Sequence, residues 1–167
     1  MKAQILTLFL IVSLTGSAWA NLGDSEEQLI AHYGKEIGIK SRDQAKGGAV
    51  ALDRLSFNES GFQIDVLLFN GISSEESVYH RPYVPLTDEE IKSLLDADAQ
   101  GHAWKEVAPQ QELLLWLKSL KSWQREDGVI ASLEGPKEKP RLLFHVKSLE
   151  LIAAEKAANE AWQKQPH

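Results

Sequence analysis

The chain has 167 residues, and its 24 acidic and 18 basic side chains give a formal net charge of −6 at neutral pH. This charge argues against nucleic acids and anionic membrane surfaces as partners, because both are bound mainly through clustered Lys and Arg. The chain contains no cysteine, which excludes disulfides, thiolate metal sites and a cysteine nucleophile.

Residues 1–20 have the three parts of a cleavable secretory signal. Lys2 supplies the positive start, and residues 5–14 form a mostly apolar run. Ala18 and Ala20 place small side chains at the two positions that a signal peptidase must accept. We therefore expect cleavage after this segment.

Two kinds of membrane attachment compete with cleavage. A spanning helix needs roughly 20 apolar residues, and the run here ends at Leu14. A lipid anchor requires a cysteine, and Ser17 stands where a bacterial lipoprotein would carry one. The sequence therefore predicts a secreted or periplasmic protein that is soluble after cleavage, with no stable membrane insertion. Its mature chain, residues 21–167, has the length of a single domain that folds without cross-links.

The first element of the mature chain is predicted to be a short helix. Ser25 and Gln28 have the spacing of a capping box, in which each side chain satisfies the backbone N–H of the other residue. Gly34 stands where a helix commonly ends on a left-handed residue. The following residues, 36–48, contain three glycines and no sustained periodicity, which predicts a loop.

Three strands are predicted next, over residues 50–57, 62–69 and 72–80. A turn at residues 58–61 separates the first two strands. Asn70-Gly71 separates the second and third, and is a strong hairpin signal because both residues tolerate the positive φ angles of a type I′ turn.

The composition of these strands predicts their places in a sheet. The second strand ends with apolar side chains on both faces, which indicates a central strand. The third strand alternates with polar residues and carries Glu75 and Glu76, as a strand near a sheet edge does.

The same Asn-Gly turn predicts the register of the hairpin. It pairs Phe69 with Ile72 and Leu67 with Ser74. A covered central strand should tolerate no charge on either face.

The most secure helix start lies after two prolines. Thr87 and Glu90 form a second capping box, and Leu86 and Ile91 occupy the positions of a hydrophobic staple. Gly101 predicts the end of this helix.

Residues 111–120 show a helical period with a high apolar content, so they require burial, either in the core or against a partner.

Residues 123–125 and 129–133 predict a second hairpin, and residues 141–146 predict a further strand. Ser148 is expected to cap a last, alanine-rich helix that packs on the sheet. Separate blocks of helices and hairpins favour an α+β fold with an antiparallel meander sheet.

A calcium loop is the most tempting motif of the chain. Asp96, Asp98 and Gly101 match positions one, three and six of such a loop. Position twelve, however, is Val107 where a bidentate glutamate is required. We interpret the motif as a helix C-terminus with exposed acids, and expect no metal site.

Catalytic motifs give no further lead. The histidines form no HExxH motif and no i, i+4 pair, and the chain has no GxSxG elbow, phosphate loop or dinucleotide fingerprint. We therefore assign no catalytic residue and no cofactor. The five histidines are His32, His80, His102, His145 and His167.

Aromatic side chains are better candidates for binding, because Tyr and Trp combine an apolar body with a polar tip. The same residues suit a core equally well. As binding candidates the sequence offers Tyr79, His80, Trp104 and Trp123.

Several motifs also carry a family resemblance: residues 25–34, Gly61-Phe62, Phe69-Asn70-Gly71, residues 86–91, Trp104-Lys105 and residues 123–128. Their order resembles that of a group of small exported bacterial proteins with no assigned function, over about residues 22–133. The opening helix, strands and Asn-Gly hairpin resemble more loosely the modules of the β-lactamase-inhibitor-protein and SmpA outer-membrane-assembly fold. The resemblance assigns no functional residue, and the lipidated cysteine of the SmpA group is missing here.

Two functions remain open. The first is an exported, non-catalytic binding module for a protein or polymer ligand of the envelope or exterior. The alternative is a hydrolase that acts on cell-wall or environmental polymers through dispersed acidic and histidine residues. A deep pocket with convergent acids or histidines of perturbed pKa would favour the enzyme, and a shallow aromatic face would favour the binding module. The oligomeric state is left open.

Overall fold

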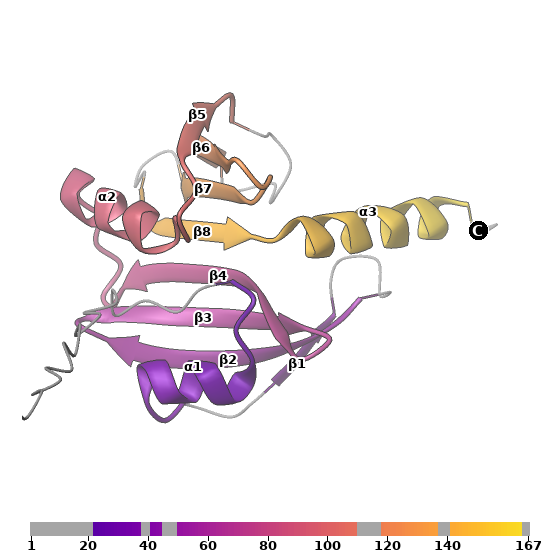
Figure 1. Ribbon diagram of the computed structural model, residues 1–167, viewed down its shortest axis with the longest axis horizontal. Helices are drawn as coiled ribbons and strands as arrows, with labels where there is room; N and C mark the ends of the chain where they lie inside the picture. Colours follow the sequence, from indigo (N-terminus) through magenta and orange to yellow (C-terminus); the bar gives the residue numbers. More distant parts are fainter. Residues whose placement is uncertain (1–21, 38–40, 45–49, 110–117, 137–140, 165–167) are drawn as a thin grey trace, which may run out of the picture.

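The computed structural model describes residues 22–37, 41–44, 50–109, 118–136 and 141–164 (Figure 1). Within these ranges the helices are α1 (Glu26–Tyr33), α2 (Asp88–Ala97) and α3 (Leu149–Gln163). The strands are β1 (Ser41–Gln44), β2 (Ala51–Glu59), β3 (Phe62–Phe69), β4 (Ile72–His80), β5 (Trp104–Val107), β6 (Lys118–Arg125), β7 (Ile130–Gly135) and β8 (Leu143–Lys147).

All of these strands form one antiparallel sheet in the order β1-β2-β3-β4-β8-β7-β6-β5. Two meanders, β1 to β4 and β5 to β8, therefore meet where β4 pairs with β8. The predicted α+β fold with an antiparallel meander sheet is confirmed.

Local signals correctly placed the starts of the helices. Ser25 and Thr87 each form a complete capping box at the start of α1 and α2. Ser148 accepts the backbone N–H of Leu151 at the start of α3. The α2 helix ends earlier than predicted, with Asp98 as its C-cap.

The hairpin at Asn70-Gly71 is also confirmed, since the two residues have φ angles of 55° and 80°. Phe69 pairs with Ile72 as predicted. The pairing of Leu67 was predicted wrongly, because the register shifts at this point and Leu67 lies opposite Glu75. The extra residue, Ser74, is buried.

Three predictions about where the strands lie were wrong, one of which placed a helix where the structure has a strand. The strand expected near an edge, β4, lies in the middle of the sheet, between β3 and β8. Residues 36–48, predicted as a loop, include the short strand β1. Of the helix predicted over residues 111–120, the last three residues belong to β6 and the rest lie outside the described residues. The edge strand β5 was not predicted at all.

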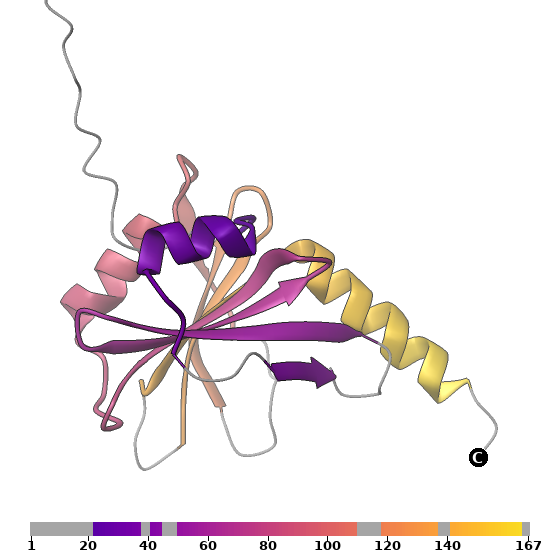
Figure 2. The same ribbon diagram turned by 90° about the horizontal axis from the view of Figure 1, so that it is seen from below.

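The two faces of the sheet are covered differently (Figure 2). Helices α1 and α2 lie on one face, which we call the α1/α2 face. It contains the larger hydrophobic cluster, which includes Phe57, Ile64, Val66, Phe144 and Val146.

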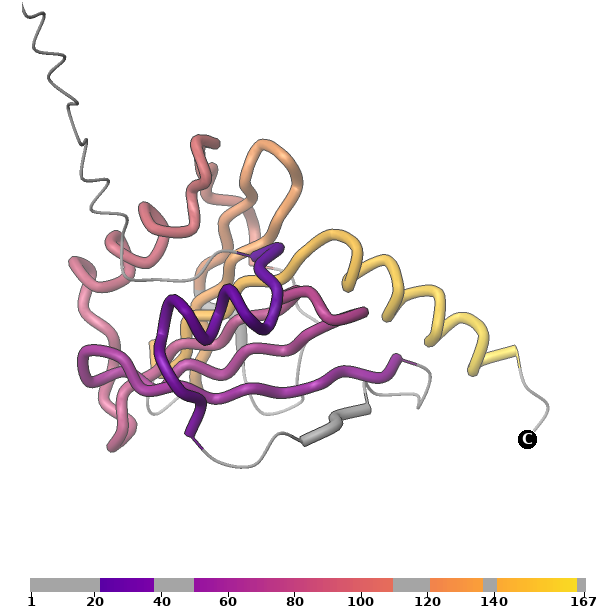
Figure 3. Tube along the Cα trace, turned by 60° about the horizontal axis from the view of Figure 1, so that its bottom comes forward, coloured from indigo at the N-terminus to yellow at the C-terminus, as the bar shows by residue number. Residues whose placement is uncertain are grey.

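On the opposite face, the α3 face, a smaller cluster joins α3 to one end of the sheet. Leu151 of α3 is fully buried there with Val50, Leu52 and Leu67. Ala154 and Ala158 of α3 also pack against this cluster, and the C-terminal end of the helix extends beyond the sheet (Figure 3). In the described part of the chain, no helix is long and apolar enough to cross a membrane.

Candidate functional site

A groove of about 380 Å³ lies between α2 and strands β5 to β7 on the α1/α2 face. Its floor is apolar and consists of Ile91, Leu95, Trp123 and Leu133. Pockets that hold small ligands start at roughly this volume and are lined mainly by apolar and aromatic side chains. The groove therefore has the size and lining of a binding site for a small apolar group.

Sequence periodicity explains this lining. Ile91 and Leu95 are four residues apart in α2, so both project from the same side of the helix. On the sheet, Lys121 pairs with Leu133, while Glu106 pairs with Trp123. Cross-strand partners share a face of the sheet, so these four side chains form one wall of the groove.

Charged side chains surround the apolar floor. Arg141 binds Asp88 at 2.5 Å, and Lys121 lies 3.8 Å from Glu106. Lys92 of α2 adds a third cation to the rim. Because these rim pairs are largely exposed, they contribute little to folding stability and remain able to exchange partners with a ligand.

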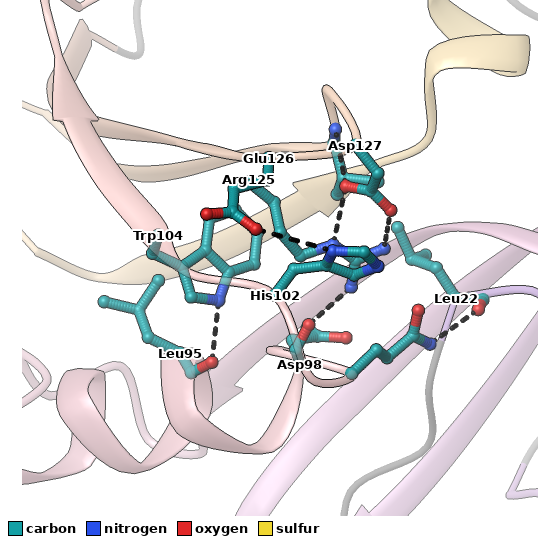
Figure 4. Close-up of polar contacts among 10 residues, drawn as sticks. Leu22, Leu95, Asp98, His102, Trp104, Arg125, Glu126 and Asp127 are labelled. Atoms are coloured by element: carbon teal, nitrogen blue, oxygen red, sulfur yellow. Dashed lines mark hydrogen bonds and ion pairs between the residues drawn. The ribbon is translucent and has the colours of Figure 1, made fainter.

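A polar network fixes α2 beside the sheet (Figure 4). The Arg125 guanidinium donates through Nη1 to the backbone oxygen of Asp98 at 2.5 Å, and through Nε and Nη2 to the Asp127 carboxylate at 2.8 and 2.7 Å. Trp104 Nε1 donates to the backbone oxygen of Leu95 at 2.8 Å. Arg125 also lies over the Trp104 ring, 5.7 Å from its centroid. The C-terminal half of α2 is thus held in place, which keeps the groove in a fixed shape.

Two buried carboxyl groups lie near this network, and neither lines the groove. Burial raises the pKa of Glu76 well above its usual value, and nearby Asp98 raises it further. Burial also raises the pKa of Asp98 to about 7, against the opposing effect of Arg125. Tyr33 Oη donates to Glu76 at 3.2 Å.

The four binding candidates do not form a single site. Trp123 lies in the floor of the groove, where its side chain is almost fully buried. Trp104 supports α2 from the neighbouring strand through Leu95. The two tryptophans therefore build and support the groove.

The other two candidates lie elsewhere. His80 stacks on Phe62 with ring centroids 4.4 Å apart, and its Nε2 lies 3.0 Å from a Glu90 oxygen. Tyr79 faces the opposite side of the sheet, where its hydroxyl donates to Asp65 at 3.0 Å. Burial, and then the Asp65 charge, raise the pKa of Tyr79 to about 12, so the hydroxyl stays neutral.

A row of polar side chains crosses the α3 face, with one residue from each of six neighbouring strands. Successive members are cross-strand partners. The row consists of Ser56, Asp65, Ser77, His145, Ser132 and Ser122. Sequence spacing alone does not reveal this arrangement, because β6, β7 and β8 lie far along the chain from β2, β3 and β4.

Two members of this row, Ser77 and His145, form the order of a hydrolytic triad together with Glu75. Ser77 Oγ lies 3.1 Å from His145 Nδ1, and His145 Nε2 lies 3.8 Å from Glu75. However, Ser77 is in the middle of β4, whose backbone pairs with β3 on one side and β8 on the other. The backbone N–H groups that would stabilise an oxyanion are therefore engaged in the sheet. The geometry favours a structural role for these residues.

Glu75 is part of an ion-pair network on the same face. Lys147 Nζ binds Glu75 at 2.8 Å and Glu155 of α3 at 3.1 Å. Burial alone would raise the pKa of Glu75, but His145 and Lys147 outweigh it and hold the pKa below its usual value. The pairing explains how Lys147 is tolerated in a buried position.

The calcium motif is divided between two environments. Asp96 is exposed and pairs with Lys92, whereas Asp98 is buried. Over the described residues, no three His, Asp or Glu side chains are placed to hold a metal ion.

The sequence did not predict that Arg125, Glu76 and Asp98 are buried ionisable residues. Arg125 is 3% exposed and Glu76 is equally buried. One signal was available, since Glu76 shares a strand face with the apolar Val78, but the alternating polar residues of this strand, with Glu75 and Glu76, predicted a position near a sheet edge. Comparison of the chain with protein-family models, curated proteins and solved structures finds no match.

Proposed function

We propose that the protein is an exported, non-catalytic binding module whose ligand places an apolar group in the groove between α2 and β5 to β7. The secretory signal in the sequence supports export, with cleavage before Asn21. The resemblance to small exported bacterial proteins supports the same location.

One observation supports the groove above all. Its floor of Ile91, Leu95, Trp123 and Leu133 is apolar, while its charges lie on the rim. An apolar floor supplies affinity and a charged rim supplies orientation. A protein or polymer that presents an apolar side chain or ring next to charged groups fits this arrangement.

The distribution of charge favours binding over hydrolysis. The two carboxyl groups with raised pKa, Glu76 and Asp98, lie in the core and not in the groove. An acid in the core cannot reach a substrate that occupies the groove, whereas general acid catalysis requires contact with the reacting group.

The test is a pull-down from the envelope fraction of the native host with immobilised residues 21–167. Leu95→Lys places a charge in the groove floor, and Ser93→Lys adds the same charge to an exposed position of the same helix. We expect the native chain and the Ser93→Lys variant to retain the same species, and Leu95→Lys to lose it. Melting curves of both variants confirm that they fold.

Equal capture by Leu95→Lys would show that the ligand does not use the groove. Capture of nothing, together with turnover of a polymer substrate, would favour the hydrolase. Export is tested separately by mass spectrometry of the secreted protein, which should begin at Asn21.

A further inference from the structure

The cations on the rim of the groove between α2 and strands β5 to β7 are held only loosely by their acidic partners. Arg141 binds Asp88, Lys121 lies near Glu106, and Lys92 binds Asp96. The side chains of these three acids are all more than half exposed. Water solvates such acids whether or not they are paired. An anionic ligand can therefore replace them on the cations at little cost.

Arg141 is the cation best placed to recognise an anion. A guanidinium has five N–H donors, and among the described residues the acidic partner of Arg141 is Asp88 alone, which it binds through Nη2. The Nε atom of Arg141 is buried without a hydrogen-bond partner, and the whole side chain is 32% exposed. Arg141 is thus partly desolvated and incompletely compensated. It gains more from an added anion than the exposed acids of the rim gain from an added cation.

The backbone of Arg141 is fixed beside the start of α2. Its φ angle is 68°, which is uncommon for a residue with a side chain. Its carbonyl oxygen accepts the backbone N–H of Leu86 at 2.8 Å. Leu86 is buried and immediately precedes Thr87, the N-cap of α2. Residues held in such conformations concentrate at binding and active sites, and Arg141 lines the groove.

The length of the groove limits the apolar group that accompanies the anion. Along α2 the lining extends from Asp88 to Leu95, which is about 10 Å at a rise of 1.5 Å per residue. One leaflet of membrane hydrocarbon is about 15 Å thick, so an acyl chain from a membrane lipid is longer than the groove. An extended peptide advances about 3.4 Å per residue. About three residues of a peptide therefore match the groove.

The acids of the rim also favour a peptide. Asp88 and Glu106 line the groove and can accept hydrogen bonds from the backbone N–H groups that a peptide presents. A fatty acid offers no such donors. An anionic lipid surface is disfavoured as well, because the chain has a formal net charge of −6.

We propose that the groove binds the carboxyl-terminal residue of a polypeptide, with its apolar side chain on the floor and its terminal carboxylate on the Arg141 guanidinium. This inference rests on the groove as the binding site of the proposed function, and names its ligand. The carboxylate takes the place of Asp88 and accepts two parallel hydrogen bonds, the strongest contact between arginine and a carboxylate. Arg141 then selects a chain end over an internal apolar residue.

The test measures the binding of three peptides to residues 21–167 by isothermal titration calorimetry. Each is an acetylated six-residue chain of glycine and serine with a different end: phenylalanine with a free carboxylate, phenylalanine amide, or serine with a free carboxylate. We expect the first peptide to bind at least about 10-fold more tightly than either of the others. Equal affinities of the phenylalanine acid and amide, or no binding of any peptide at millimolar concentration, would overturn the proposal.

Two variants locate the selectivity. Arg141→Gln removes the guanidinium, and Lys105→Gln removes an exposed cation of β5 that does not line the groove. In Arg141→Gln the affinities of the phenylalanine acid and amide should differ by less than about 2-fold, whereas Lys105→Gln should keep the preference. Melting curves establish that both variants fold, and a preference that persists in folded Arg141→Gln would contradict the assignment. Should Arg141→Gln not fold, the comparison of acid and amide in the native chain still decides.

A fourth probe, octanoate, tests the competing source of an apolar carboxylate. Tighter binding of octanoate than of the phenylalanine acid would overturn the proposal in favour of a fatty acid. The groove itself is tested separately by Leu95→Lys in the pull-down. If the peptide acid and amide bind equally and Leu95→Lys still loses the captured species, the proposed function stands and only the carboxyl-terminal ligand fails.

Discussion

The two faces of the sheet differ in how they bury adjacent glutamates of one strand. Glu75 and Glu76 follow each other in β4 and therefore point to opposite faces. On the α3 face, burial alone would raise the pKa of Glu75, but His145 and Lys147 hold it below its usual value. On the α1/α2 face, burial and Asp98 raise the pKa of Glu76. The same residue type is thus an ionised partner on one face and favours its neutral form on the other.

This difference reflects how each face is covered. Two helices and a large apolar cluster cover the α1/α2 face, so a charge there loses most of its hydration. The α3 face contains the polar row and an apolar cluster at one end, and its charges are paired with partners from neighbouring elements. Stability on the first face comes from apolar packing, and on the second it depends more on polar partners.

The largest predicted effect compares adjacent positions of β3. Val66 is fully buried in the large cluster, and Leu67 lies in the smaller cluster under α3. Val66→Lys should cost more than about 4 kcal/mol and unfold the protein. Leu67→Lys should cost about 2–3 kcal/mol, because the lysine stem can reach solvent beside α3. Urea denaturation followed by circular dichroism measures both, and equal losses would mean that the two faces are equally closed.

The next effect separates the two glutamates. Glu75→Gln should destabilise by about 2–3 kcal/mol at pH 7, because it breaks the buried pair with Lys147. The loss should shrink near pH 3, since the depressed pKa gives stability that disappears as the pH falls through it.

Glu76→Gln should have the opposite pH dependence. The raised pKa of Glu76 means that the native chain loses stability as the pH rises above about 4. Removal of the acid should therefore be neutral near pH 4 and stabilise the protein at pH 8. Chemical denaturation at both pH values decides this, and a parallel response of the two variants would contradict the assignment of the faces.

A smaller effect is expected at the turn that directs β3 and β4 to their faces. Gly71 has a φ of 80°, and a Cβ added there would meet nothing within 4 Å. Gly71→Val should therefore destabilise by about 1–2 kcal/mol through backbone strain alone. Gly71→Asn is the matched control and should cost less, because asparagine tolerates this conformation. Equal melting temperatures of the native chain and the valine variant would contradict this explanation.

The smallest effect concerns calcium. Asp96 is exposed beside Lys92, while Asp98 belongs to the buried acids of the α1/α2 face. Millimolar calcium should leave the melting temperature within about 1 °C of its value in chelator. A calcium loop of micromolar affinity would instead add about 4 kcal/mol, so a rise of many degrees would disprove this reading of the two aspartates.

Much of the local structure was determined by short-range signals in the sequence. The capping boxes of Ser25 and Thr87, the Asn70-Gly71 turn and the apolar pattern of β3 all act between residues a few positions apart. Such signals need no knowledge of the rest of the fold. They were sufficient to predict α1, α2 and α3, the first hairpins and the α+β class, but not β6, whose first residues were predicted as part of a helix.

Only the tertiary structure decided the position of β4, the roles of its two glutamates and the location of the groove. The sequence pattern of β4 resembles an edge strand, but its pairing with β8 places Lys147 opposite Glu75, which is partly buried, and Glu76 is fully buried on the other face. The groove likewise requires α2 to be fixed against β5 and β6 by Trp104 and Arg125. The physical reason is that the free energy of a buried charge depends on partners supplied by distant segments, and those partners are set by the pairing of whole strands.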